Sequence, residues 1–115
     1  MLKSYLKYLF RRKNEFHIHS PFVYALYTKV IRGGDEGALE TLGIERTEQV
    51  GVGEIPEMVD KVMYVMEDIH GDKKKEAFWD TICADPDVTL TIDLYEKGLF
   101  FHREGMEKQD FVLRS

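Results

Sequence analysis

The chain has 115 residues, of which 43% are hydrophobic and 32% are charged. These values are typical of one small globular domain with a modest core. No apolar run reaches the length of a membrane-spanning helix, and the first residues lack the cleavage pattern of a secretory signal. A single cysteine, Cys83, rules out a disulfide within the chain, so a reducing cytoplasm is the expected compartment.

The net charge of −5 is unevenly distributed along the chain. Residues 1–32 carry seven basic residues and one acidic residue, whereas residues 33–115 have a net charge of −11. This asymmetry predicts that the basic segment lies against the acidic remainder of the same chain. Docking of the basic segment on an acidic partner, a nucleic acid or a membrane is the alternative.

Two helices are predicted in residues 1–32. The first has apolar residues at positions 2, 5, 6, 9 and 10 and basic residues on its other side, so it can pack on a core, on a second subunit or on a membrane surface. The second starts at Ser20-Pro21, an N-cap and a favoured first residue, and ends at Gly33-Gly34. His17 and His19 precede it, and we expect them to fix the loop because no further metal ligand stands at a suitable spacing.

Residues 33–53 form a weakly patterned, acidic connector. We expect a short helix at 36–42, a brief strand at 48–52 and another short helix at 55–59. Gly51 and Gly53 form a Gly-x-Gly pattern and are the weak candidates for a cofactor-binding loop. Such a loop normally follows a buried strand, and no apolar strand of normal length precedes this one. A turn or a strand end is therefore the expected role of the two glycines.

The clearest pattern lies between residues 62 and 103. A continuous apolar run predicts a strand at 62–67 that is covered on both faces. Asp72 can cap a helix at 73–84, which Asp85-Pro86 ends. Alternating residues predict a strand at 88–95, a turn at Lys97-Gly98 and a return strand at 98–103, with a further short strand or extended tail at 110–114. The apolar stripe of the helix comprises Phe78, Trp79, Ile82 and Cys83.

Four stretches of the chain resemble a class I S-adenosylmethionine-dependent methyltransferase family from Bacteroidetes-type bacteria: HIHSPFVYALYTKVI near the start, then MEDIHGDKKKEAFWDTI, VTLTIDLYEKGLFFHR and DFVLRS. In the family, the cofactor-binding part lies between the first stretch and the other three. In this chain that part is nearly all missing. The resemblance implies a partial Rossmann-like sheet.

The predicted fold is one α+β domain over residues 1–115. It comprises a helical part (1–32), the connector (33–53) and a part like the C-terminal end of the methyltransferases (54–115). In it, two N-terminal helices and one crossover helix pack on a small mixed sheet. We expect the strand from Leu99 to lie between the strands from Val62 and Val88.

The resemblance also indicates weak metal candidates, Glu67, Asp68 and His70. In related metal-dependent O-methyltransferases an acidic pair at the end of this strand helps to hold a divalent metal. The family usually reads Asp-Asp-Ile-His, whereas this chain has Glu67 first, and the earlier strands with further ligands are missing. We therefore expect Asp68 to cap a turn and His70 to form hydrogen bonds nearby. No catalytic set is recognisable, and Cys83 is expected to be buried and unreactive.

The expected function is that of a non-enzymatic methyltransferase remnant, a protein-interaction or oligomerisation module without cofactor. The alternatives are a methyltransferase-like or S-adenosylmethionine-binding protein completed by a second subunit, and a basic-helix docking module for an anionic surface. A homodimer is expected because residues 62–66 form an uncharged strand edge that needs a cover, from segment 48–52 or from a second copy. A nucleic-acid partner is not expected because Tyr95, Phe100 and Phe101 lack interleaved basic residues.

Overall fold

The structure, a computed structural model, describes residues 20–114. Its helices are α2 (Pro21–Ala25), the π-helical continuation η2 (Leu26–Ile31), α3 (Ala38–Thr41) and α4 (Lys73–Ala84). Its strands are β1 (Arg46–Gln49), β2 (Val62–Glu67), β3 (Leu90–Asp93), β4 (Lys97–Phe101) and β5 (Gln109–Val112). The first predicted helix, His17 and His19 lie outside the described residues. Within residues 20–114, no helix has both the length and the hydropathy needed to cross a membrane.

The strands form one mixed sheet in the order β1-β2-β4-β3-β5. Strand β1 runs parallel to β2, and β3 runs parallel to β5, while β4 is antiparallel to both of its neighbours. The α+β class and the predicted place of the strand from Leu99 are therefore confirmed. Four strands end, and β4 begins, at the same edge of the sheet, which we call the carboxyl edge.

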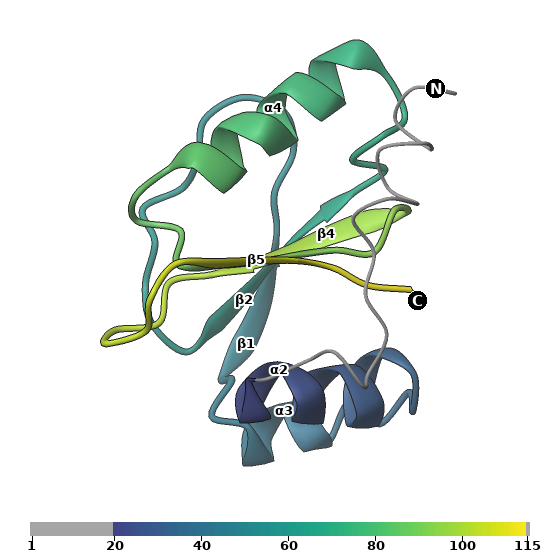
Figure 1. Cartoon of the computed structure of the whole chain (residues 1–115), viewed down its shortest axis with the longest axis vertical. Helices are drawn as coiled ribbons and strands as arrows, with labels where there is room; N and C mark the ends of the chain where they lie inside the picture. Colours follow the sequence, from purple (N-terminus) through teal and green to yellow (C-terminus); the bar gives the residue numbers. More distant parts are fainter. Residues whose placement is uncertain (1–19, 115) are drawn as a thin grey trace.

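Helices cover both faces of the sheet, with α2 and α3 on one side and α4 on the other (Figure 1). The core under α2 and η2 includes Leu26, Tyr27, Val65, Ile92 and Phe101. The core under α4 includes Met66, Ile69, Phe78, Trp79 and Phe100. Because both faces are covered, the side chains of β3 are buried on both sides, including the polar Thr91 and Asp93.

Helix α4 has the predicted bounds and the predicted start. The Asp72 carboxylate caps it by accepting a hydrogen bond from the Lys75 backbone N–H at 2.8 Å. Phe78, Trp79 and Ile82 are buried, as predicted. Cys83 is half-buried rather than buried, with its thiol beside Thr91 of β3.

The segment between β1 and β2 differs from the prediction. Residues 50–59 contain no helix, so the helix expected at 55–59 is wrong. The side chains of Ile55 and Met58 instead pack on the α4-side core, and the Val59 N–H donates to the Tyr64 hydroxyl at 3.0 Å. These tertiary contacts hold the backbone in an irregular path, because they replace the hydrogen bonds that a helical turn would have formed.

Strand β1 covers the exposed edge of β2, which is one of the two covers expected. It lies at Arg46–Gln49 rather than at 48–52, and it pairs from Arg46 opposite Val62 to Gln49 opposite Val65. The chain therefore supplies this cover itself, and β2 leaves no edge for a second copy.

The helix that starts at Ser20 is regular for only five residues. The Ser20 hydroxyl accepts from the Val23 N–H at 3.3 Å, which confirms the predicted cap. From Leu26 onward the helix is of the π type, where a regular helix was expected. The Arg32 N–H donates to the carbonyl of Tyr27, five residues earlier, at 2.8 Å. Over only six residues, the spacing of the apolar side chains cannot distinguish an α-helix from a π-helix.

The remaining predicted elements are present but shorter or shifted. The helix expected at 36–42 is a single turn, α3, and the strand expected at 88–95 is reduced to β3. The strands expected at 98–103 and 110–114 correspond to β4 and β5. The predicted turn at Lys97-Gly98 is wrong, because both residues belong to β4 and the chain turns earlier, where Tyr95 has a φ of 69°.

Candidate functional site

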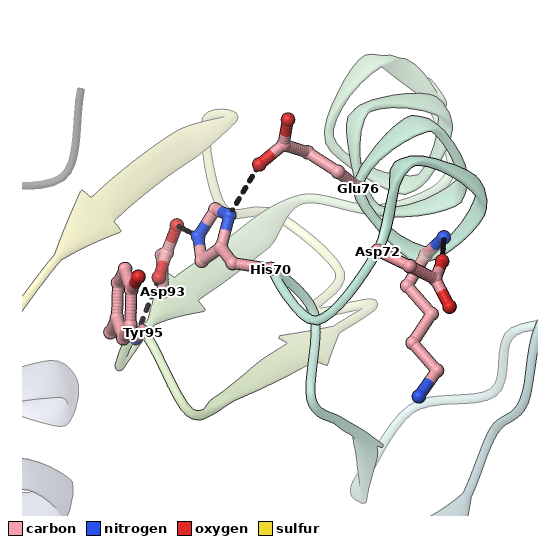
Figure 2. A network of polar contacts seen from close by, with 6 residues as sticks. His70, Asp72, Glu76, Asp93 and Tyr95 are labelled. Atoms are coloured by element: carbon pink, nitrogen blue, oxygen red, sulfur yellow. Dashed lines mark hydrogen bonds and ion pairs between the residues drawn. The ribbon is translucent and has the colours of Figure 1, made fainter. Parts of the chain in front are cut away.

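The candidate site lies at the carboxyl edge, where the chain leaves β2 and enters α4. Asp68 takes a φ of 57°, and its backbone N–H donates to the Glu96 carbonyl at 2.6 Å. Gly71 lies so close to the Asp68 carboxylate that an added Cβ would be 2.1 Å from it. This tight turn places His70 between the first turns of α4 and the end of β3 (Figure 2).

His70 is held between two carboxylates. Its Nε2 lies 2.8 Å from Asp93 Oδ2, and its Nδ1 lies 3.0 Å from Glu76 Oε2. The side chains of His70 and Asp93 are 8% and 11% exposed, whereas that of Glu76 is 34% exposed. The ring of Tyr95 stacks on the imidazole with centroids 5.1 Å apart, and the Tyr95 N–H donates to Asp93 Oδ1 at 2.8 Å (Figure 2).

These contacts determine the charge of the imidazole. Burial lowers the pKa of His70, but the hydrogen bonds to Asp93 and Glu76, together with their charges, outweigh burial and raise the pKa above its ordinary value of 6.5. Because each ring nitrogen already has a carboxylate partner, neither is free to coordinate a metal or to accept a proton from a substrate. The cluster is therefore suited to joining elements of the fold rather than to acid–base catalysis.

The three metal candidates do not converge in the structure. Glu67 is exposed at the end of β2. The Asp68 carboxylate pairs with Lys75 Nζ at 2.9 Å, and His70 is engaged by Asp93 and Glu76. Within residues 20–114 no group of three or more His, Cys, Asp or Glu side chains is arranged to hold a metal ion.

The two candidate cofactor glycines also lie apart from this cluster. Gly51 and Gly53 are exposed in the connection from β1 to β2. A Cβ added at either position would meet no atom within 4 Å. A glycine that allows a cofactor to approach the backbone would follow a buried strand, whereas β1 is polar and mostly exposed.

A groove opens near the carboxyl edge, on the face of the sheet that η2 and α3 cover. Its volume is about 500 Å³. Its lining combines apolar side chains with the polar residues Glu36, Thr47, Gln49, Glu67 and Lys97. An apolar groove with a few polar groups is the usual form of a binding site. Its apolar lining comprises Val30, Ile31, Leu39, Met63, Val65, Leu94 and Leu99.

Cys83 does not provide a nucleophile. Burial raises the pKa of its thiol to about 11, despite a hydrogen bond to Thr91 that acts in the opposite direction. The reactive form, the thiolate, is therefore scarce at neutral pH.

Sequence reasoning placed His70 in a hydrogen-bonded turn but missed its partners Glu76, Asp93 and Tyr95. One signal was present. Asp93 is the one charged residue in the strand predicted at 88–95, and a buried charge needs a partner.

Comparisons of the chain with models of known protein families, with curated proteins and with solved structures found no match.

Proposed function

We propose that this chain is a non-enzymatic remnant of a class I S-adenosylmethionine-dependent methyltransferase that serves as a protein-interaction or oligomerisation module. Two features support the proposal. Antiparallel β4 lies between the parallel strands β2 and β3, in the order predicted for this fold. Helix α4 forms the crossover between those two parallel strands.

The main support for the proposal is that the sheet stops at β1, its outermost strand on this side. In the methyltransferases the strand that matches β2 is interior, and the cofactor-binding half of the sheet continues beside it. Here a single strand of four mostly exposed residues lies beyond β2. A βαβ unit takes about 30 residues or more, whereas residues 50–61 join β1 to β2 without a helix. Within residues 20–114 this arrangement leaves little that could hold the cofactor.

Two surfaces are suited to binding a protein. One is the apolar groove at the carboxyl edge. The other is the outer edge of β1, which pairs with no strand in the described part of the chain. This edge is short and carries Arg46 and Glu48, features that discourage open-ended pairing. Pairing of two copies about a two-fold axis would cover the β1 edge of both copies without leading to open-ended growth, so we retain the homodimer as part of the proposal.

The runner-up is a methyltransferase-like or cofactor-binding protein completed by a second subunit. The outer edge of β1 favours it, because further strands supplied by a partner would continue the sheet there. The third hypothesis, a basic-helix docking module for anionic surfaces, depends on residues that lie outside the described part. We further propose a reducing cytoplasm as the compartment, since the one cysteine of the chain has no partner thiol.

Titration calorimetry with S-adenosylmethionine, run beside analytical ultracentrifugation at tens of micromolar protein, tests these hypotheses. We expect no saturable binding up to millimolar ligand, and a mass of twice 13.5 kDa. A micromolar dissociation constant, about −8 kcal/mol, would contradict the loss of cofactor binding and, in a dimer, would favour the runner-up. A clean mass of 13.5 kDa without ligand binding would remove the homodimer and leave the groove as the surface for another protein.

A further inference from the structure

The geometry around His70 requires its charged form. Each ring nitrogen lies within hydrogen-bond distance of a carboxylate oxygen, at 2.8 Å and 3.0 Å. An ionised carboxylate can only accept hydrogen bonds, so each nitrogen must donate one. Only the imidazolium has two N–H groups. The neutral ring would leave a nitrogen lone pair facing the oxygen of Glu76 or Asp93.

We propose that His70 is a pH-sensitive latch that, while protonated, holds the first turns of α4 against the carboxyl edge of the sheet.

The Glu76 contact is the part of the latch that opens. Asp93 lies in β3, is nearly buried, and is also held by the Tyr95 N–H. Glu76 is about one-third exposed and can turn towards water. When the ring loses a proton, the tautomer protonated at Nε2 keeps the bond to Asp93. The Nδ1 lone pair then faces the Glu76 carboxylate, and the two separate.

The charged groups around the ring set the direction of the pH dependence. Asp93 approaches from β3 and Glu76 from α4, and both stabilise the proton on His70. Lys75, the neighbouring cation of α4, pairs with Asp68 instead. Because the pKa of His70 is raised in the folded protein, the latch is fully closed below pH 6.5 and opens as the pH rises through the raised pKa.

When the latch opens, the rest of the fold keeps its structure, so the opening stays local. The Asp72 cap does not depend on His70, and Phe78 and Ile82 anchor the remainder of α4 in the core. The opening therefore affects the turn at residues 69–72 and the start of α4, while the helix stays formed. Local opening of this kind appears in amide hydrogen exchange.

The experiment combines an NMR titration of the His70 ring with amide exchange at Gly71 and Glu76, from about pH 6 to about pH 9. We expect His70 to titrate above 6.5. After correction for base catalysis, exchange at the two amides should rise with pH. The rise should stay below about tenfold for each unit by which the pKa of His70 exceeds 6.5, because the open state keeps the contact with Asp93.

Two variants test whether the pH dependence of amide exchange comes from the latch. Glu76→Gln removes one carboxylate at a partly exposed position, so the pKa of His70 should fall and the rise in exchange should shrink. Asp68→Asn is the matched control. It breaks the neighbouring pair with Lys75 but leaves both partners of His70, and asparagine tolerates the positive φ of this position. Its pH dependence should match the parent.

Three results would overturn the proposal. One is a His70 that titrates at or below 6.5 in the parent. Another is a Glu76→Gln variant that keeps the full pH dependence of exchange. The third is loss of that dependence in Asp68→Asn, which would assign the effect to the neighbouring ion pair.

Discussion

Trp79 of α4 lies directly against Gly98 of β4, with no space for a side chain between them. A Cβ added to Gly98 would be 2.4 Å from two carbons of the indole ring. Trp79 is 3% exposed, so the ring has little room to move away. The residue that the sequence pattern assigns to a turn is therefore a contact point between helix and sheet.

We expect Gly98→Ala to lower the free energy of unfolding by about 1–3 kcal/mol, the usual cost of overpacking a core. Gly51→Ala is the matched control, because a Cβ there meets nothing within 4 Å. It should change the stability by less than about 0.5 kcal/mol. Urea denaturation of the two variants and the parent makes the comparison. Equal stability of the two variants would show that Trp79 does not pack on Gly98.

Phe78 should be a core residue, since it is 8% exposed and packs with the α4-side core. We expect Phe78→Ala to cost about 3–5 kcal/mol, a large share of the stability of a small domain. Tyr24→Ala offers a control at an aromatic residue that is 47% exposed, and it should cost much less. Thermal denaturation followed by circular dichroism measures both. A Phe78→Ala variant that melts within a degree or two of the parent would contradict the packing of α4.

The Cys83 thiol should react slowly while the protein is folded. A rise in the pKa from 9.0 to about 11 lowers the thiolate fraction at pH 8 by about a hundredfold. Alkylation with iodoacetamide, followed by mass spectrometry, should therefore be at least that much slower in the folded protein than in urea, where the thiol regains its ordinary pKa. Equal rates in the two states would mean that burial does not protect the thiol.

Local chemistry made α4 and β2 predictable from the sequence. The Asp72 cap, the apolar stripe and the stop at Asp85-Pro86 each involve residues a few positions apart, so the bounds of α4 follow from the sequence. The uninterrupted apolar run of β2 likewise indicates a strand covered on both faces. The place of β4 between β2 and β3 was predicted as well.

Tertiary structure decided the features that depend on distant partners. Strand β1 is polar and short, and it becomes a strand because β2 offers a free edge for pairing. Residues 50–59 stay irregular because core contacts and the Tyr64 hydroxyl replace helical hydrogen bonds.

The candidate site shows the same division between local and long-range information. The sequence marks the turn at His70. It does not show that Glu76 and Asp93, which lie 6 and 23 positions further along, bind opposite nitrogens of the imidazole ring. Cap and periodicity signals extend over a few residues, whereas this cluster forms only when α4 crosses over the sheet and brings the ends of β2 and β3 together.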